Sequence, residues 1–156
     1  MSATIRSHTA ADRPILLDFI HALQEAERAI HDSRLPGDEV AGLCYQGLLG
    51  QGAEILIAET GGEHVGFVAG WLAVDDDPLQ TAEWRRHGYV SDVFVAPQWR
   101  GRGIGQQLLQ AIGDRLRERG ARRLRIGALA ANGTAIAAFR RFGFQPFEIT
   151  FDRPLS

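Results

Sequence analysis

A segment rich in glycine and arginine, Pro97-Gln-Trp-Arg-Gly-Arg-Gly-Ile-Gly105, carries the residue types and spacing that most clearly predict chemistry. Its three glycines let the backbone turn tightly and keep side chains away from a ligand. The segment lies between an expected strand ending at Val95 and an expected helix beginning near Gly103, and free N–H groups at a helix N-terminus bind anions. Arg100 and Arg102 add charge-assisted donors suited to phosphate. We therefore expect a phosphate site here, with a pyrophosphate as the favoured ligand.

Two common nucleotide-binding motifs do not fit this segment. The dinucleotide fingerprint requires G-x-G-x-x-G, whereas Gly101, Gly103 and Gly105 have the wrong third spacing. The Walker motif requires a lysine, and all 17 basic residues of the chain are arginine. The remaining alternative is a turn that only joins strand to helix, which does not account for three glycines and two arginines together.

The pattern of apolar residues predicts the elements that must position this segment. Helical spacing predicts helices over 9–30, from 36 to about 48, over 104–120 and over 132–142. β-Branched and aromatic residues predict strands at 4–8, 54–58, 65–74, 89–95, 124–129 and 144–151. Helices first, then a hairpin, then alternating strands and helices are typical of a mixed α/β (α+β) sheet, and we expect a single domain spanning residues 1–156.

Composition narrows the class of protein further. The chain has 156 residues, 45% of them apolar, which is enough for one domain with its own core. The absence of lysine excludes a Schiff-base lysine and attachment of pyridoxal phosphate. The net charge of -2 is unevenly distributed along the chain. Residues 85–141 hold 12 arginines and three acidic residues, a net charge of +9, so the remaining residues carry a net charge of -11. The chain therefore has a basic block and an acidic block.

The sequence predicts neither an intrachain disulfide, nor a membrane span, nor a metal site. The single cysteine, Cys44, cannot form an intrachain disulfide, and the N-terminal residues hold no apolar signal region, so we expect a cytoplasmic location. No apolar run is long enough to span a membrane. The five histidines show no spacing typical of metal ligands, so we expect no metal.

The glycine-rich segment also carries a family resemblance. Arg100-Gly-Arg-Gly-Ile-Gly105 is similar to the R/Q-x-x-G-x-G/A motif of the GNAT superfamily of N-acetyltransferases, and it follows a strand and opens a helix as in that family. Val93-Phe-Val-Ala-Pro-Gln-Trp-Arg100 resembles the core strand and exit loop, and the stretch from Asn132 through Phe139 to Gly143-Phe144 resembles a later helix of that family. The resemblance implies a GNAT-like fold, a mixed and mostly antiparallel central β-sheet flanked by helices on both faces.

The resemblance implies acetyl-coenzyme A (acetyl-CoA) as co-substrate and direct transfer of its acetyl group to a primary amine in a ternary complex. Backbone groups of Val93 and Val95 would pair with the pantetheine arm, and the N–H of Val93 would polarise the thioester carbonyl. Asn132, which is equally suited to cap a helix, would reach the pantetheine, and Phe139 would lie near the thiol. The implied cofactor-binding residues are Val93, Phe94, Val95, Arg100, Gly101, Arg102, Gly103, Ile104, Gly105, Gln106, Asn132 and Phe139.

At the positions where the family has its general acid and general base, this chain has different residues. Many relatives have a tyrosine at the position of Phe139, where it protonates the leaving thiolate, and a glutamate at the positions matching Tyr89 or Ser91. Strand alternation predicts Tyr89 and Ser91 on the same face as Val93, where either would position a water or carry a proton. Asp92 is expected on the opposite face, with a structural role favoured. The candidate catalytic residues are therefore Tyr89, Ser91 and Asp92.

The acidic block suggests the kind of acceptor. Its side chains would attract a cationic amine, or they are simply solvated helix faces and caps. They are Glu25, Glu27, Asp32, Asp38, Glu39 and Asp75 to Asp77. We expect a small-molecule or peptide amine as acceptor, neither nucleic acid nor membrane as partner, and a homodimer as one option for the assembly.

Three alternatives remain open. The donor could be another acyl-CoA, or the acceptor could be a protein N-terminus or a lysine. A degenerate module that binds CoA without catalysis is also open, since Phe139 and Ser91 replace the usual tyrosine and glutamate. The arginines at 115–125 alternate with Asp114 and Glu118 as on a solvated helix face, which disfavours a nucleic-acid binder.

Overall fold

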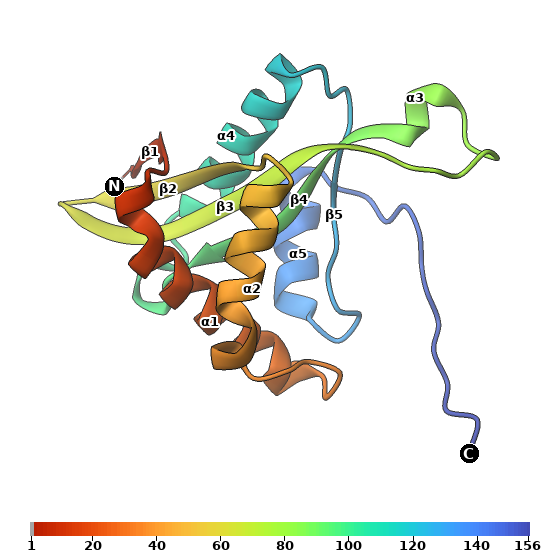
Figure 1. The fold of residues 1–156 in the computed structure, drawn as a ribbon, viewed down its shortest axis with the longest axis horizontal. Coiled ribbons are helices and arrows are strands. Elements are labelled where there is room, and N and C mark those ends of the chain that lie inside the picture. Colours follow the sequence, from red (N-terminus) through yellow and green to blue (C-terminus); the bar gives the residue numbers. More distant parts are fainter. Residues whose placement is uncertain (1) are drawn as a thin grey trace.

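A five-stranded β-sheet runs through the middle of the protein, with helices on both faces (Figure 1). The computed structural model describes residues 2–156. The strands pair in the order β1-β2-β3-β4-β5, and only the pair of β4 and β5 is parallel. Their bounds are β1 Thr4–Ser7, β2 Glu54–Thr60, β3 Glu63–Val74, β4 Arg86–Val95 and β5 Leu124–Ile126. The mixed, mostly antiparallel sheet predicted from the sequence is confirmed.

The helices form two layers. Helices α1 (Arg13–Ile30) and α2 (Gly37–Gly50) cover one face, and α4 (Ile104–Glu118) and α5 (Gly133–Phe142) lie on the other (Figure 1). A single turn, α3 (Ala82–Arg85), lies in the long connection from β3 to β4. Two short 3₁₀ helices, Ala10–Asp12 and Pro97–Trp99, precede α1 and follow β4.

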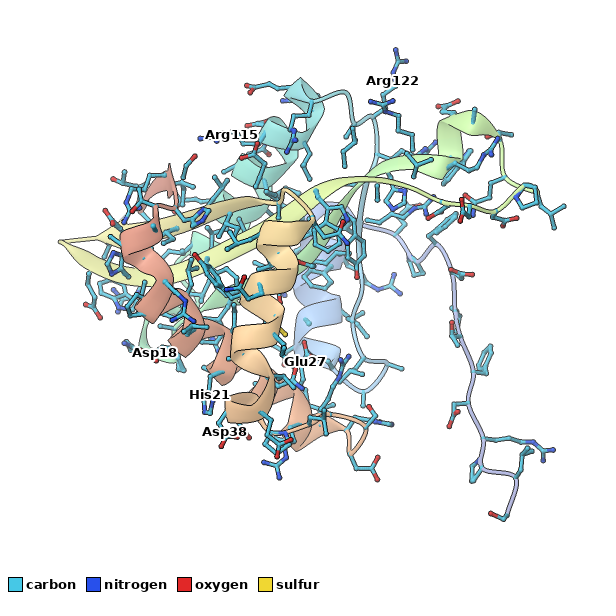
Figure 2. The ribbon with its side chains drawn as sticks, in the orientation of Figure 1. Asp18, His21, Glu27, Asp38, Arg115 and Arg122 are labelled. Atoms are coloured by element: carbon cyan, nitrogen blue, oxygen red, sulfur yellow. The ribbon has the colours of Figure 1, made fainter. Side chains whose placement is uncertain are left out.

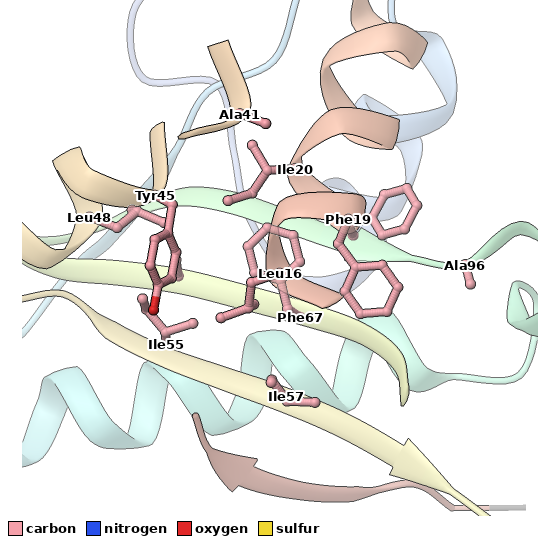
Figure 3. Packing of buried hydrophobic residues seen from close by; sticks show 12 residues of the cluster. Leu16, Phe19, Ile20, Ala41, Tyr45, Leu48, Ile55, Ile57, Phe67 and Ala96 are labelled. Carbon is pink, nitrogen blue, oxygen red and sulfur yellow. The ribbon is translucent and has the colours of Figure 1, made fainter. Parts of the chain in front are cut away.

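Two apolar clusters hold these layers on the sheet. On the face of α1 and α2, the Phe19 ring lies 6.1 Å from the ring of Phe67 and 5.4 Å from that of Phe94 (Figure 3). On the other face, α4 buries the helically spaced residues Ile104, Leu108, Leu109, Ile112 and Leu116. Strands β2 and β3 contribute to both clusters, which explains why their sequences are almost continuously apolar.

A buried carboxylate fixes the start of α1 against the sheet. Two guanidinium nitrogens of Arg6 donate to the two carboxylate oxygens of Asp12, at 2.8 and 2.9 Å, and Arg6 Nε donates to Glu59 at 2.8 Å. The Thr9 N–H donates to Asp12 at 2.7 Å, as in a capping box. The Arg6 guanidinium holds the pKa of Asp12 far below its usual range, and the Thr9 N–H adds to this against the opposing effect of burial.

The C-terminal part differs from the sequence expectation. Strand β5 ends at Ile126, three residues early, and the strand predicted over 144–151 is wrong, because this segment pairs with no strand in the described chain. After α5 it passes beside β5 and then runs away from the body (Figure 1). Pro146, which has no backbone N–H to donate to a ladder, lies near its start. Within residues 2–156, no helix combines the length and apolarity needed to cross a membrane.

Candidate active site

One edge of β4 is open next to the glycine-rich segment. Strand β4 pairs with β5 only through Gly88, Tyr89 and Val90, whereas its pairing with β3 continues to Val95. The Ala96 N–H donates to the Val65 carbonyl at 2.8 Å, so Ala96 faces β3. Because backbone groups alternate along a strand, those of Val93 and Val95 face the open side. Beyond Val90, this edge of β4 pairs with no strand among the described residues.

The N-terminus of α4 lies directly beyond this edge. Gly101 and Gly103 have φ angles of 77° and 80°, in the left-handed region that glycine adopts without strain. The first helical hydrogen bond runs from the Gln107 N–H to the Gly103 carbonyl at 3.1 Å. The N–H groups of Ile104, Gly105 and Gln106 therefore belong to the first turn, where a helix supplies no acceptor for them. A helix start of this kind is suited to an anion, and the anion site expected from the sequence stays a prediction.

The two arginines of the segment each lie near an aromatic ring, one on β4 and one in the segment itself. Arg100 Nε donates to the Val95 carbonyl at 2.8 Å, and its guanidinium lies 5.6 Å from the Phe94 ring centroid. The Arg102 guanidinium lies 4.8 Å from the Trp99 ring centroid. Arg100 thus ties the loop to β4 and already occupies the carbonyl of Val95, a backbone group that the sequence assigned to a ligand.

A cavity of about 620 Å³ lies between β4, β5, α5 and the C-terminal segment. Tyr89 and Phe139 both line it. The Phe139 ring meets the Phe144 ring edge-on, with centroids 5.9 Å apart. Asn132 caps α5 by accepting a hydrogen bond of 3.2 Å from the Ala135 N–H, so the capping role is the one observed. Tyr89 of β4 and Phe139 of α5 therefore line the same cavity.

A β-bulge at Ser91 changes which residues of β4 share a face. Asp92 stands opposite Ala69 and Val90 opposite Gly70, so Ser91 has no partner of its own on β3. Gly70 permits this crowding, since a Cβ there would lie 2.6 Å from the Tyr89 carbonyl oxygen. The register of β3 and β4 is shifted by one residue at this point.

The bulge corrects the predicted side-chain directions. Tyr89 stands opposite Trp71, with ring centroids 5.2 Å apart, and Trp71 packs on the α1 and α2 side. Ala69, opposite Asp92, belongs to that same cluster, whereas Val93 packs toward α4. Directly opposite residues point the same way, so Tyr89 and Asp92 share a face and Val93 does not. The prediction that Tyr89 and Ser91 share the face of Val93 is therefore wrong for Tyr89, because alternation fails across a bulge, and Ser91 is the bulged residue itself. Asp92 lies on the face opposite Val93, as predicted.

Asp92 is a partly buried carboxylate with one close donor. The Ser91 Oγ donates to Asp92 Oδ2 at 2.6 Å. Burial raises the pKa of Asp92, and the Ser91 hydroxyl opposes part of that rise. Burial also raises the pKa of the Cys44 thiol, with smaller contributions from the charges of Asp92 and Glu27, so α1, α2 and β4 bring acidic groups to one place. Nothing in the sequence pointed to this influence of Asp92 on Cys44.

Half of the acidic residues expected to attract an amine use their carboxylates on other parts of the chain. Glu25 accepts a hydrogen bond of 2.9 Å from the Gly37 N–H at the start of α2. Glu27 pairs with Arg34 at 3.3 Å, and Asp75 with Arg125 at 2.6 Å. Asp77 accepts from the Leu79 N–H at 2.9 Å. Asp32, Asp38, Glu39 and Asp76 are exposed. No group of three or more potential metal ligands occurs among the described residues.

Comparison with known families shows to which family the chain belongs. The model of the acetyltransferase (GNAT) family matches residues 17–144. The chain belongs to this family. The match includes the open edge of β4, the glycine-rich segment and α5, and the GNAT resemblance stated from the sequence is confirmed.

Curated relatives of this GNAT chain include a streptothricin acetyltransferase and an aminoglycoside acetyltransferase. Streptothricin acetyltransferase of Streptomyces lavendulae is 39% identical over 79 residues, which are 51% of this chain and 39% of that protein. Aminoglycoside N(6')-acetyltransferase type 1 of Stenotrophomonas maltophilia is 33% identical over 107 residues, which are 67% of this chain and 69% of that protein. The chain therefore spans less than half the length of the first of these relatives.

Solved structures share the whole GNAT fold. Aminoglycoside N-acetyltransferase AAC(6')-Iy, in complex with the bisubstrate analogue CoA-S-monomethyl-acetylneamine, superposes with a TM-score of 0.74 at 16% identity. The match covers 100% of both chains. At this level of identity the likeness concerns the fold.

Proposed function

We propose that this protein is an acetyl-CoA-dependent N-acetyltransferase that transfers an acetyl group to a primary amine by direct attack in a ternary complex. The observation that carries the proposal is the open edge of β4 at Val93 and Val95, which leads directly to the free N–H groups at the start of α4. An extended arm that ends in a pyrophosphate has the shape and charge for this pair of features. Family membership supports the same conclusion.

In this proposal the backbone binds most of the co-substrate. Val93 and Val95 offer N–H groups to the amides of the pantetheine arm, in the manner of an added strand. The pyrophosphate lies at the start of α4, within reach of Arg102 and of the backbone from Gly101 to Gln106. The Arg100 bond to the Val95 carbonyl keeps the loop in place, so Arg100 acts on the site through the loop. Asn132 and Phe139 on α5 border the thiol end.

The acceptor amine must lose a proton before it attacks. A lysine-like amine has a pKa near 10.4, so presenting its neutral form at pH 7 costs roughly 4 to 5 kcal/mol. Asp92 is the best-placed base, because the bulge turns it toward the α1 and α2 face and burial raises its pKa. The Ser91 hydroxyl donates a hydrogen bond to Oδ2 of Asp92. The other carboxylate oxygen, Oδ1, is therefore the one that accepts the proton from the amine. The amine attacks the thioester carbon, and the Val93 N–H, on the neighbouring residue, stabilises the oxyanion that forms at the carbonyl oxygen.

The leaving thiolate then takes up a proton as the C–S bond breaks. Phe139 has no proton to give, but Tyr89 lines the same cavity and carries a phenol. We assign Tyr89 to this step. The reaction needs little help from a general acid at this step, because the thiolate of a thiol with a pKa near 8.5 is already a good leaving group.

A cationic amine is the acceptor that the charges favour. Asp32, Asp38, Glu39 and Asp76 are exposed acidic residues of the α1 and α2 region and of the β3–β4 connection. The streptothricin and aminoglycoside acetyltransferases support an amine acceptor by their names. A protein N-terminus or a lysine, and another acyl-CoA as donor, are the nearest variants of this proposal.

Release of the free CoA thiol tests the proposal. The purified protein is mixed with acetyl-CoA and a panel of polyamines, amino sugars and peptides, and the thiol is measured with a chromogenic disulfide. Calorimetry with CoA runs in parallel. We expect CoA to bind and at least one amine to accelerate thiol release. If CoA binds but no acceptor gives turnover, the protein is instead a degenerate binding module, and if CoA does not bind, the proposal is wrong.

A further inference from the structure

A second cavity, of about 220 Å³, lies between α4, β5 and the end of α5. None of the residues assigned above to acetyl-CoA lines it. Pockets for drug-sized ligands measure about 300–1,000 Å³, so this cavity suits a smaller ligand with the size of one ring. Apolar side chains beside guanidinium groups favour a ligand that is apolar at one end and anionic at the other. The lining combines Leu109, Leu124 and Phe142 with three arginines, Arg117, Arg122 and Arg123.

Two of these three arginines carry a charge that the described chain does not neutralise. Arg117 pairs with Asp114, the one acidic residue of the lining, and it lies in the last turn of α4, where a cation is favourable. Arg122, in the turn that follows α4, forms no ion pair within residues 2–156 (Figure 2). The Arg123 guanidinium lies 3.4 Å from the Trp84 ring centroid, and its Nε is buried with no hydrogen-bond partner in the same part of the chain. A buried donor without an acceptor is costly, so an anion in the cavity would offer an acceptor to Arg123 and a charge to Arg122.

Gly113 keeps this cavity open in the middle of α4. Glycine in a helix interior is less favourable than alanine, so its presence there calls for a reason. Packing supplies none, because an added Cβ would lie 3.7 Å from Leu124 Cδ2, an ordinary contact distance. At Gly70, by contrast, a Cβ would lie 2.6 Å from the Tyr89 carbonyl oxygen. Since Gly113 lines the cavity, the missing side chain leaves room for a ligand.

We propose that this cavity binds a small organic anion that carries one phosphate or carboxylate on a ring-sized apolar body. Leu109, Leu124 and Phe142 contact the apolar body. The guanidinium groups of Arg122 and Arg123 bind the anionic group, whose oxygens match their planar donors. The site uses the later turns of α4, whereas the proposed acetyl-CoA site uses the first turn. Both sites can therefore be occupied at once, and this inference does not depend on acetyl transfer.

The probe for this site is phenyl phosphate, with phenol and inorganic phosphate as its separate parts. Amide NMR spectra of the isotope-labelled full chain, saturated with CoA to occupy the start of α4, show which residues the probe shifts and how tightly it binds. We expect shifts at Gly113, Ala121 and Leu124, and tighter binding of phenyl phosphate than of either part. Arg122→Gln should weaken binding about fivefold or more, because a charge-assisted hydrogen bond is lost. Arg119→Gln removes a nearby exposed arginine that does not line the cavity, and it should change the affinity by less than about twofold.

A second variant, Gly113→Met, fills the cavity and should remove binding of the probe, with a circular dichroism melt close to that of the wild type. If that variant does not fold, Arg122→Gln decides. The proposal is wrong if the lining amides do not shift at millimolar phenyl phosphate, if inorganic phosphate binds as tightly as phenyl phosphate, or if Arg119→Gln and Arg122→Gln lose affinity equally. Shifts confined to residues 103–106, and seen only when CoA is left out, would place the probe at the start of α4 and overturn the proposal as well. If CoA itself does not bind, the same signals are read without it, so a failure of the proposed function leaves this test intact.

Discussion

The Ser91 hydroxyl donates a 2.6 Å hydrogen bond to Oδ2 of Asp92, across a bulge that turns this carboxylate toward α1 and α2. The two residues are neighbours in sequence, yet Ser91 is the extra residue of β4 and Asp92 is paired with Ala69 on β3. The bulge therefore sets both the direction of the carboxylate and the donor that adjusts its pKa. A base so positioned lies beside the Val93 N–H without sharing its face.

Replacing Asp92 with Asn should remove the base while keeping its size. We expect kcat/KM for the amine to fall about 10² to 10⁴-fold, the range for general bases, with little change in the affinity for CoA. In the wild type, log kcat/KM should rise with pH as Asp92 ionises, above the usual range for an aspartate because burial raises its pKa. Asp92→Asn should lack this limb, and Asp92→Glu should keep it. A wild-type pH profile in Asp92→Asn would contradict the assignment.

Replacing Ser91 with Ala should change the pH dependence more than the rate. The Ser91 hydroxyl lowers the pKa of Asp92, so its loss raises that pKa further. The acidic limb of the pH profile should then move to higher pH, with a similar plateau at alkaline pH. Steady-state kinetics across pH measures both quantities. If the acidic limb of the Ser91→Ala profile stays in place, or moves to lower pH, the Ser91 hydroxyl does not lower the pKa of the catalytic base.

Replacing Gly103 with Glu should act on acetyl-CoA alone. A side chain at a φ of 80° costs about 1 to 2 kcal/mol locally, and a carboxylate there repels phosphate. We expect the KM for acetyl-CoA to rise about tenfold or more. Arg100→Ala should have a milder effect, since it loosens the loop. Gly52→Glu is the matched control, because Gly52 also has a positive φ, 63°, and an added Cβ there meets nothing within 4 Å. Equal effects of the two Glu variants would point to folding instead of phosphate binding.

Replacing Tyr89 with Phe should slow the release of the thiol. We expect kcat to fall about tenfold, a modest loss because the thiol leaves readily without help. Phe139→Tyr, in the same cavity, should recover part of the rate in the Tyr89→Phe background by supplying a new phenol. Single-turnover measurement of CoA release compares the three proteins. Full activity in Tyr89→Phe alone would remove Tyr89 from the mechanism.

Replacing Asp12 with Asn should destabilise the fold without touching the site. The variant leaves Arg6 without its bidentate partner, and we expect the free energy of unfolding at neutral pH to fall by about 2 to 3 kcal/mol. Because the folded pKa of Asp12 lies below its unfolded value, near 3.9, its contribution is present above about pH 4 and is lost as the pH falls further. Urea unfolding at several pH values should show the difference between the proteins shrinking in acid. A difference that is constant down to pH 3 would contradict the linkage.

Periodicity predicted the layers of the fold because each layer buries an apolar stripe. The face of α4 from Ile104 to Leu116 and the opening of that helix after the glycine-rich segment both follow from the sequence. The direction of Tyr89 relative to Val93 did not, since a bulge inserts one residue between them and reverses the alternation. The presence of Gly70 opposite the bulge was the one local signal, because a glycine inside a strand often marks such an irregularity.

The C-terminal segment shows a second limit of the same reasoning. Phe147, Ile149 and Phe151 have the alternation of a strand, but alternation does not say which edge will pair with it. Likewise, the sequence could place Glu25 and Asp75 in the acidic block but not reveal that a helix start and Arg125 already use them. Such partners depend on contacts between distant parts of the chain.

A crystal structure with acetyl-CoA bound tests the central claim most directly. The account predicts the pantetheine arm along the open edge of β4, hydrogen-bonded to the backbone of Val93, with the pyrophosphate on the N–H groups of Ile104, Gly105 and Gln106. Density for the co-substrate anywhere else, with this edge and the start of α4 left bare, would contradict it.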